Sequence, residues 1–469
     1  MIKKELIVGA VDIGTTKIVT IIGKKNDSGR LEILAMAKTE SKGVKRGVVQ
    51  NIEETVSAIQ KTVQEAELKA GIKLTEVFVG IAGQHIRSIK NRGYINRDSY
   101  EDEITREDIK ALENDMRKIP IDVGEEIIHV IPQSYIVDNE TGVKYPVGMS
   151  GKRLEANFHI VIAQIASAKN IEKCVHRVGL KVRNLILEPL ASAEAVLTDD
   201  EKEAGVAIVD IGGGTTDIAV YYDDIIRHTA VIPFGGNVIT KDIKEGCAIL
   251  QRQAELLKVQ FGSALGEMAE EDKVVSIPGI AGREPKEISF KSLAFIIQSR
   301  MEEILDAVTF EIENSGYMDK LSAGIVITGG GALLKHLPQL VKFKTGMDVR
   351  IGYPSEHLAA NTSAEINQPL YSTSAGLVLK GFEYLKDSTN LPDHQPIRND
   401  YRIETRVEKE IMVEPEPIPE PVQQVKAQEM EKELVSDESS SSESKNKPKF
   451  FDNFKKTFSD LFEEKDSAM

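Results

Sequence analysis

Two short segments of the chain share an aspartate, glycine and threonine pattern that suits phosphate binding. The first reads VDIGTTKIVTIIG from Val11, and the second reads VDIGGGTTDIAVYY from Val209, so that Asp12 and Asp210 hold matching positions. Glycine lets a backbone approach a ligand closely, threonine hydroxyls and main-chain N–H groups donate to phosphate oxygens, and an aspartate can hold a hydrated magnesium ion. One such turn is usually only a hairpin. Two matched turns predict two lobes that clamp one phosphate chain.

A third glycine cluster supports this clamp. The segment AGIVITGGGALLKHLPQL carries Gly329, Gly330 and Gly331 between a buried-strand pattern and a helical one, which predicts close backbone approach beside a helix start. The two matched turns are neither P-loops nor Rossmann loops. Both of those motifs lead from a strand into a helix, whereas each of these turns is followed by β-patterned sequence. EPLASAEAVL from Glu188 and YSTSAGLVL from Tyr371 are rich in small residues. They predict two closely crossing helices where the lobes hinge.

The elements that must position these turns follow an α/β alternation up to about residue 387. LIVGAVDI, KIVTIIG, LEILAMA and EVFVGIA are predicted strands. A helix is predicted to start after Asn51, with Glu54 reaching back to the cap, and to end at Gly71. The apolar face of this helix is formed by Val56, Ile59, Val63 and Ala66.

Composition excludes several classes of protein. A chain of 469 residues, 41% of them hydrophobic, exceeds the size at which single cores stop growing, so it is predicted to be multidomain. The formal net charge of -15 argues against nucleic-acid binding. Cys174 and Cys247 are far apart in the sequence and predict reduced thiols in a cytosolic protein. The N-terminal apolar run is cut by Asp12, which favours a strand over a signal peptide, and no run reaches the roughly 18 apolar residues of a membrane span.

The periodicity ends near residue 387. Residues 387–447 contain EPEPIPEP and SDESSSSES, with 15 acidic and 8 basic residues, and are predicted to be a disordered, extended linker. PKFFDNFKKTFSDLFEE follows, and residues 448–464 are predicted to form an amphipathic helix that binds a membrane surface or a partner. Its apolar arc is formed by Phe450, Phe451, Phe454, Phe458, Leu461 and Phe462. A fold-back onto the globular body is the alternative.

The five segments, in this order, resemble the actin, Hsp70 and sugar kinase superfamily. Its two phosphate motifs, two connect motifs and adenosine motif match residues 12–17, 188–197, 210–217, 328–338 and 371–379. The chain is further similar to the FtsA family of bacterial division proteins, over about residues 5 to 382 and the terminal helix. This likeness lies in GIAGQHIRSIKNRGYI, VIPQSYIVD, YPVGMSGKRLEANFHIV, FGGNVITKDI and RIGYP.

The resemblance implies a site for ATP and Mg²⁺. Asp12 and Asp210 would face the hydrated Mg²⁺, and Lys17 would neutralise phosphate charge. The phosphates would be wrapped by Gly14, Thr15, Thr16, Gly212, Gly213, Gly214 and Thr215. The adenosine pocket would be lined by Gly329, Gly330 and Gly331.

Three further residues of the ATP site follow from the same resemblance. Glu255 and Lys258 would lie near the ribose and base, although their i,i+3 spacing equally suits a surface ion pair. Glu188 holds the position of the residue that polarises the attacking water, which a carboxylate does as a general base. Because the family uses ATP mainly as a structural ligand, we expect weak hydrolysis at most.

The resemblance also implies an architecture: an α/β, actin-like, two-lobed fold of duplicated ribonuclease H-like domains with a small SHS2-type α+β insert. Lobe 1 would comprise residues 1–82, 165–196 and 355–386, with the insert at 83–164. Lobe 2 would comprise a core at 197–233 and 301–354 and a subdomain at 234–300. Within the insert, ITREDIKALENDMRK is a predicted helix, and HVIPQSYIV and FHIVIAQIA are predicted strands.

The implied function is that of an ATP-loaded filament on the cytoplasmic face of the cell membrane at the division site. It would tether the tubulin-like FtsZ ring there by binding the FtsZ C-terminal tail, for which Lys286 and Arg300 match family positions, although ordinary surface charges are the alternative. The insert would contact the next subunit and later division proteins. Three rival functions stay open: a small-molecule kinase of the superfamily, a pilus-assembly adaptor, and a scaffold whose terminal helix binds a protein groove.

Overall fold

The computed structural model describes residues 6–100, 102–279, 284–359 and 363–389. By contacts the chain divides into two units, Met1–Pro396 and Ile397–Met469, and every described residue belongs to the first. The predicted linker at 387–447 therefore lies almost wholly, and the predicted terminal helix wholly, outside the described residues. No helix in the described ranges is long and apolar enough to cross a bilayer.

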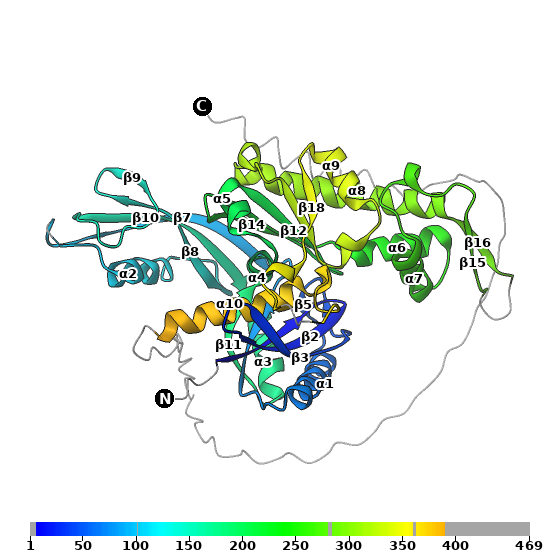
Figure 1. Cartoon of the computed structure of the whole chain (residues 1–469), viewed down its shortest axis with the longest axis horizontal. Coiled ribbons are helices and arrows are strands. Elements are labelled where there is room, and N and C mark those ends of the chain that lie inside the picture. The colour runs from blue at the N-terminus through cyan, green and yellow to red at the C-terminus, as the bar shows by residue number, and fades with distance from the viewer. Residues whose placement is uncertain (1–5, 101, 280–283, 360–362, 390–469) are drawn as a thin grey trace, which may run out of the picture. The chain divides into compact units, whose positions relative to one another are not determined.

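Lobe 1 is built on a five-stranded sheet of order β11-β6-β1-β2-β3 (Figure 1). Its strands are β1 (Ile7–Ile13), β2 (Lys17–Lys25), β3 (Leu31–Glu40), β6 (Glu76–Ile81) and β11 (Lys181–Leu187). β1, β2 and β3 form an antiparallel meander, and β6 pairs parallel with both β1 and β11. A small hairpin, β4 (Val44–Lys45) with β5 (Val48–Val49), follows the meander.

Helix α1 (Ile52–Ala70) begins after Asn51 and ends at Gly71, as the sequence predicts. The Asn51 side chain accepts a hydrogen bond from the N–H of Glu54, and Gly71 ends the helix in the left-handed conformation. Ile59, Val63 and Ala66 are buried in the core beside the sheet. α3 (Ile165–Arg177) packs beside α1 in the same core. The predicted apolar face is confirmed.

Lobe 2 repeats this arrangement in a sheet of order β14-β13-β12-β17-β18. β12, β13 and β14 form an antiparallel meander, and β17 pairs parallel with β12 and β18. The bounds are β12 (Val206–Ile211), β13 (Thr216–Tyr222), β14 (Ile225–Ile232), β17 (Ile325–Thr328) and β18 (Val349–Ile351). The helices beside this sheet are α5 (Asp199–Ala204), α8 (Phe290–Ser315) and α9 (Leu337–Thr345), with short 3-10 turns at Met318–Lys320 and Gly330–Leu333.

The expected helix start beside the third glycine cluster is displaced. The chain passes through the 3-10 turn at Gly330–Leu333 before α9 begins at Leu337. His336 lies in the left-handed conformation and Pro338 occupies the first turn of α9, where its fixed φ suits a helix start. The glycines therefore form a tight turn after β17 and not the N-terminus of α9.

Two helices cross between the lobes, α4 (Glu188–Val196) and α10 (Ser372–Thr389). A Cβ atom at Gly376 of α10 would lie 1.8 Å from the carbonyl oxygen of Ala191 in α4, so the two backbones touch. The close crossing predicted from the small-residue segments is present. Short 3-10 turns at Pro354–Glu356 and Pro369–Tyr371 lead into α10.

The insert between β6 and α3 forms a separate antiparallel sheet of order β7-β10-β8-β9. Its elements are β7 (Ile86–Asn96), α2 (Arg106–Met116), β8 (Glu125–Val137), β9 (Glu140–Val143) and β10 (Arg153–Gln164). Thr105 caps α2 through a reciprocal capping box with Asp108. Leu112 and Met116 pack α2 onto the sheet. The predicted helix and strands of the insert are confirmed, except that β10 ends at Gln164 and the following Ile165 already begins α3.

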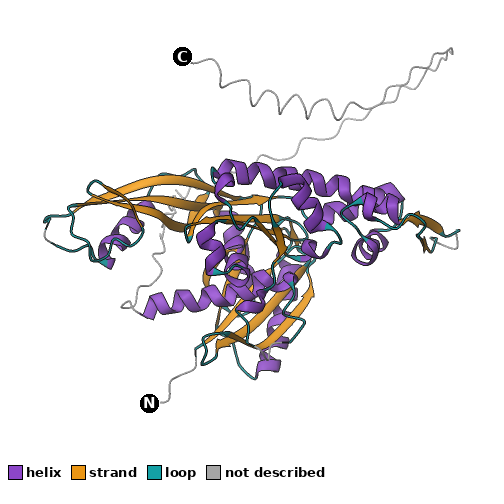
Figure 2. Cartoon of the chain, turned by 45° about the horizontal axis from the view of Figure 1, so that its top comes forward, coloured by secondary structure: helices purple, strands orange, loops and turns teal. Residues whose placement is uncertain are grey.

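The insert also contacts the edge strand of lobe 2, as Figures 1 and 2 indicate. Ser88 Oγ donates to the carbonyl oxygen of Thr229 at 3.2 Å, and His159 Nε2 lies 2.8 Å from Thr229 Oγ1. Gln133 donates to the carbonyl oxygen of Ile226. The insert, although connected in sequence to lobe 1, is thus hydrogen-bonded to β14 of lobe 2.

A subdomain extends lobe 2 on the side away from the insert (Figure 1). It contains α6 (Gly236–Cys247), α7 (Gln251–Phe261), a 3-10 turn at Gly266–Met268, and the hairpin of β15 (Val274–Ile277) and β16 (Lys286–Ser289). α8 joins this subdomain to the lobe 2 core, because its buried face includes Leu293, Ile297, Met301 and Ile304.

Candidate functional site

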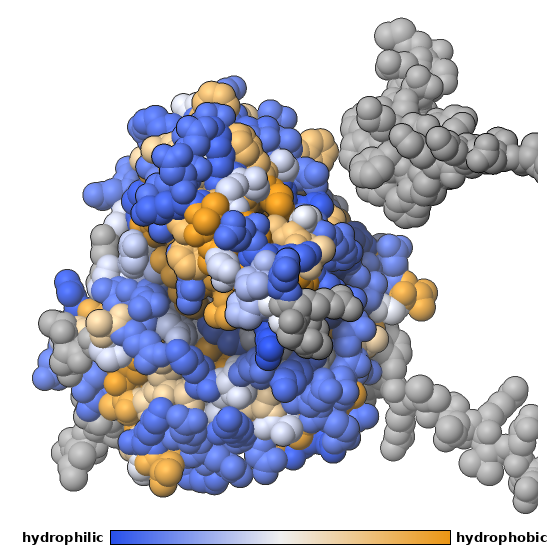
Figure 3. Space-filling view, turned by 90° about the vertical axis from the view of Figure 1, so that its right-hand side faces the viewer, coloured by the Kyte–Doolittle hydropathy of each residue, from blue (hydrophilic) through white to orange (hydrophobic). Residues whose placement is uncertain are grey.

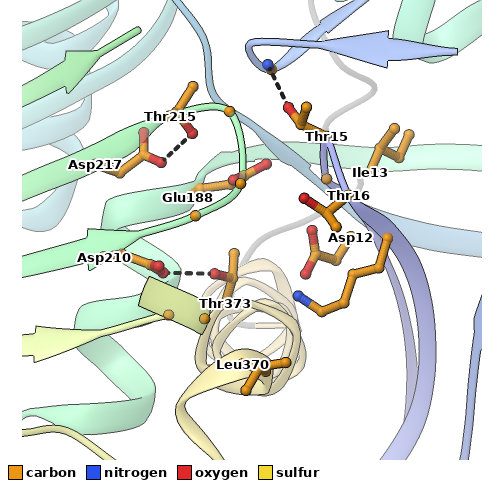
Figure 4. Close-up of a pocket in the computed structure, with 18 residues that line it drawn as sticks. Asp12, Ile13, Thr15, Thr16, Glu188, Asp210, Thr215, Asp217, Leu370 and Thr373 are labelled. Carbon is orange, nitrogen blue, oxygen red and sulfur yellow. Dashed lines mark hydrogen bonds between the residues drawn. The ribbon is translucent and has the colours of Figure 1, made fainter. Parts of the chain in front are cut away.

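The two matched turns lie opposite each other and line one pocket between the lobes (Figure 4). The β1–β2 turn supplies one wall and the β12–β13 turn supplies the other. The predicted residues that line the pocket are Asp12, Gly14, Thr15, Thr16, Lys17, Glu188, Asp210, Gly212, Gly213, Gly214, Thr215, Gly329 and Gly330. Residues that sequence reasoning did not select also line it: Ile13, Gly47, Asp217, Leu370 and Thr373. Gly331, Glu255 and Lys258 do not.

Glycine is required where the two turns meet. A Cβ atom at Gly213 would lie 1.8 Å from Thr16 Oγ1, and one at Gly214 would lie 2.4 Å from Thr15 Oγ1. Gly329 has a φ of 81°, and a Cβ atom there would lie 2.2 Å from Asp210 Oδ1. Gly213 and Gly214 therefore let the backbone of lobe 2 approach the Thr15 and Thr16 hydroxyls of lobe 1, and Gly329 lets the chain pass close to Asp210. Close backbone approach of this kind lets main-chain groups of the turns contact a ligand directly.

The two aspartates at matching positions of the turns, Asp12 and Asp210, are held by hydroxyl groups from the crossing helices. Asp210 Oδ2 accepts from Ser192 Oγ of α4 at 2.6 Å and from Thr373 Oγ1 of α10 at 2.9 Å (Figure 4 shows the latter). Asp12 Oδ2 accepts from Ser374 Oγ of α10 at 2.6 Å. The hinge helices thus orient the carboxylates, which leaves Oδ1 of each free of these hydroxyl bonds.

The pocket carries an excess of negative charge. Burial, followed by the charges of Asp12, Asp217 and Asp210, raises the pKa of Glu188 well above its usual value. Burial, followed by the charge of Asp210, raises the pKa of Asp217 to about 8. Burial also raises the pKa of Asp210. Among the described residues that line the pocket, Lys17 alone carries a positive side chain.

The donor set fits a hydrated cation better than a directly bound one. Asp217 Oδ1 is buried without a hydrogen-bond partner, and four carboxyl groups face a single lysine, so an added cation would relieve their mutual repulsion. Yet the described ranges contain no group of three or more His, Cys, Asp or Glu side chains close enough to ligate one metal ion. Carboxylates that contact the water shell of Mg²⁺ suit this spacing, because Mg²⁺ usually keeps several of its waters.

Glu255 and Lys258 lie behind the second phosphate turn and not in the pocket. They form the ion pair that their spacing suggested, with 2.8 Å between Lys258 Nζ and Glu255 Oε2. Lys258 Nζ also donates to the carbonyl oxygen of Gly236 at 2.9 Å, and the N–H of Gly236 donates to the carbonyl oxygen of Gly212. The pair therefore braces the start of α6 against the phosphate turn.

Lys286 and Arg300 lie on the lobe 2 subdomain, and both side chains bind α6. Lys286 Nζ donates to the carbonyl oxygens of Cys247 and Ala248 at the end of that helix. Arg300 pairs with Asp242 of α6 at 2.5 Å and with Glu303 of its own helix at 2.5 Å. Both cations are thus engaged within the chain. The six apolar residues of the predicted terminal helix, Phe450, Phe451, Phe454, Phe458, Leu461 and Phe462, lie outside the described residues.

Comparison with known proteins agrees with this geometry. A solved structure, the PilM-PilN type IV pilus biogenesis complex, covers 81% of this chain and 99% of its own with a TM-score of 0.58 and 15% sequence identity, which is a likeness of fold alone. The family model "SHS2 domain inserted in FTSA" matches residues 83–162, and the model "Cell division protein FtsA" matches residues 207–376. The two lobes have the same sheet topology, and their paired turns face one pocket. Together with this insert, these features define an actin-like protein.

Curated relatives narrow the class to one family. Cell division protein FtsA of Pseudomonas aeruginosa is 40% identical over 388 residues, which is 82% of this chain and 92% of the relative. Cell division protein FtsA of Escherichia coli (strain K12) is 37% identical over 387 residues, which is 81% of this chain and 91% of the relative. The chain belongs to the FtsA family of cell division proteins.

Proposed function

We propose that the chain binds ATP with Mg²⁺ in the pocket between the lobes. The observation that carries this proposal is the pair of glycine and threonine turns that face each other across the pocket. Their main-chain N–H groups and the Thr15, Thr16 and Thr215 hydroxyls would hold the phosphates, and Lys17 would offset their charge. Asp12 and Asp210, held by hinge hydroxyls, would contact water bound to Mg²⁺. Gly329 and Gly330, which line the pocket, would face the adenosine, and Gly331 would complete their turn.

Glu188 would act on the attacking water, as a general base, only after losing its proton. Burial and three neighbouring carboxylates raise its pKa, which favours the protonated form without bound cation. Bound Mg²⁺ supplies the positive charge that lowers the pKa of nearby carboxyl groups. A base that depends on this compensation supports slow hydrolysis, in which ATP serves chiefly to hold the two lobes together.

The finer part of the proposed function is a membrane-attached filament that anchors the FtsZ ring to the cytoplasmic membrane at the division site. Its support outside family membership is the sequence of residues 448–464. Six large apolar side chains on one helical arc would each gain roughly 1.5–3 kcal/mol on full burial, less the cost of ordering the helix. One such anchor is reversible, whereas many along a filament bind firmly. The insert would recruit later division proteins and contact the next subunit.

The subdomain that carries α6, α7 and β15 would receive the FtsZ C-terminal tail. Figure 3 faces this end of the described unit and shows apolar surface set among hydrophilic side chains. Exposed apolar residues here include Leu256 and Val259 of α7, Met268 of the following 3-10 turn and Val274 of β15. Because Lys286 and Arg300 already bind α6, their proposed part is to shape this surface and add positive charge to it.

Liposome co-sedimentation tests the membrane part. The full chain is compared with a truncation that ends at Lys447, each with and without ATP and Mg²⁺. Phe454→Asp with Phe458→Asp places two charges on the apolar arc, and Thr457→Asp with Ser459→Asp places the same charges on the polar face as a matched control. We expect the full chain and the polar-face control to pellet with lipid, and more strongly with ATP. Pelleting of the apolar-arc variant would refute membrane insertion.

Binding of a synthetic FtsZ C-terminal tail, measured by fluorescence anisotropy, tests the ring contact. We expect Lys286→Ala to weaken binding, while Lys273→Ala, which removes an equal charge from an exposed pair with Glu270 in the same subdomain, leaves it unchanged. Lys286→Ala removes bonds to the α6 terminus, so circular dichroism must first show an intact fold. Equal affinities for the two variants would place the tail elsewhere.

A further inference from the structure

The small β4–β5 hairpin of lobe 1 reaches the rim of the phosphate pocket. Its two-residue turn consists of Arg46 and Gly47, with φ values of 50° and 73°. Gly47 lines the pocket, and its N–H donates to Thr15 Oγ1 of the first phosphate turn at 3.1 Å (Figure 4). The hairpin tip is therefore fixed directly against the turn that would hold the phosphates.

Arg46 stands where a two-residue hairpin turn ordinarily has asparagine, aspartate or glycine. Both central residues of such a turn need a positive φ. This conformation is unfavourable for most residues that carry a Cβ atom, arginine included. Strain of this kind persists where surrounding structure imposes it, and it concentrates at ligand clamps. Since Arg46 is exposed, packing does not explain the choice of arginine. Its guanidinium, however, makes a specific contact.

That contact crosses from lobe 1 to lobe 2. The Arg46 guanidinium carbon lies 5.6 Å from the ring centre of Phe234, within the range of a cation–π interaction. Phe234 follows β14, and its carbonyl oxygen accepts from Thr216 Oγ1 beside the second phosphate turn at 2.9 Å. Phe234 as a whole residue is 40% exposed. Arg46 forms no ion pair within the described ranges, so Phe234 is its recognised partner.

We propose that Arg46 and Phe234 form a clasp between the lobes that closes the pocket over the phosphates and slows nucleotide release. The proposal rests on the proposed binding of ATP. Each partner is fixed to a different phosphate turn, Arg46 through Gly47 and Thr15, and Phe234 through Thr216. Opening the lobes to release nucleotide must separate them. Among the described residues that line the pocket, Lys17 alone has a positive side chain. The Arg46 guanidinium brings a second positive charge to the edge of the pocket.

The test measures the release rate of a fluorescent ATP analogue from the full chain, with excess ATP and Mg²⁺ as chase. An exposed cation–π contact is worth about 0.5–1 kcal/mol, which corresponds to release about two- to fivefold faster in Arg46→Ala and in Phe234→Leu. The double variant is expected to be no faster than the single ones, because both remove the same contact. Arg46→Lys should give an intermediate rate.

Lys45→Ala is the matched control, because Lys45 is exposed on the same hairpin and carries the same charge. We expect its release rate to equal that of the unchanged chain. Arg46→Asn separates the clasp from a structural role, since asparagine suits the left-handed position. We expect Arg46→Asn to release nucleotide faster while its thermal midpoint without nucleotide is equal or higher.

Three outcomes would overturn the clasp. Equal nucleotide release rates for Lys45→Ala and Arg46→Ala would show that the Arg46 side chain acts only through its charge. Additive effects of Arg46→Ala and Phe234→Leu would show that the two residues act separately. A lower thermal midpoint for Arg46→Asn with unchanged release would assign Arg46 a purely structural role. If the unchanged chain fails to bind ATP at all, the proposed function falls first and the clasp falls with it.

Discussion

Gly376→Ala in α10 is the substitution whose effect the structure defines most sharply. In an exposed helix, replacing glycine by alanine stabilises by about 1 kcal/mol. Here the new Cβ atom would lie 1.8 Å from the carbonyl oxygen of Ala191, and that obstacle is backbone. The helices must separate by about 1.2 Å to restore the shortest separation that real Cβ contacts show. Overpacking of this kind costs about 1–3 kcal/mol, so we expect a net loss of stability of up to about 2 kcal/mol.

The same displacement reaches the pocket through Ser374, two residues earlier in α10. Its bond to Asp12 is 2.6 Å long, and a shift of about 1.2 Å away from its partner takes it beyond hydrogen-bond length. We therefore expect weaker binding of ATP together with the loss of stability. Equilibrium denaturation and titration with a fluorescent ATP analogue measure the two effects on one preparation.

Gly381→Ala in the same helix is the control. A Cβ atom at Gly381 would meet side-chain atoms of Phe78 and Val8 at 2.7 Å, and side chains yield more easily than backbone. We expect a smaller loss of stability and unchanged ATP binding. If Gly376→Ala proves as stable as the unchanged chain, or more stable, the close helix crossing as described is wrong.

Three further predictions concern the pocket and the insert. Glu188→Gln removes a carboxyl group whose pKa is raised by burial, so we expect equal or higher stability without nucleotide and loss of ATP hydrolysis; undiminished phosphate release would exclude Glu188 as the base. Gly213→Ala places a Cβ atom 1.8 Å from Thr16 Oγ1, and about 1–3 kcal/mol of overpacking at the ligand turn predicts ATP binding weaker by about fivefold to a hundredfold in calorimetry, a result that unchanged affinity would contradict. Burial lowers the pKa of His159 from 6.5 to about 4, so the stability due to its neutral ring is complete above about pH 6.5 and is lost as the pH falls toward 4. We expect the thermal midpoint of His159→Gln to decline less steeply over that range. If the midpoints of the variant and the unchanged chain decline in parallel, His159 does not cause the loss of stability.

Local patterns were sufficient to predict four strands of the lobe 1 sheet and the matched turns of both lobes. A tight turn of glycine and threonine joins β1 to β2, and a turn of the same kind joins β12 to β13. The duplication was therefore visible in the sequence alone. The caps of α1 were equally local, because Asn51 and Gly71 act within one turn of the helix. The sequence therefore identified most of the pocket lining from two short motifs.

Contacts between distant segments were not predictable in the same way. Ser192 and Thr373 bind Asp210 across 18 and 163 residues, and the small-residue pattern of their helices predicted only close packing. The hydroxyl groups within that pattern were the signal that was available. Asp217 closes the second phosphate motif but pairs locally with Thr215, so only its burial revealed its place in the pocket.

The contact between the insert and β14 bears on how deletion experiments are designed. β14 is the edge strand of the lobe 2 sheet, and insert side chains bind its carbonyl oxygens at Ile226 and Thr229. An uncovered edge strand offers its backbone to other chains and promotes aggregation. A variant lacking residues 83–164 would expose this edge strand. If such a variant failed to support division, aggregation would explain the failure without the loss of any partner. Substitutions on the outer face of α2 leave β14 covered and avoid that ambiguity.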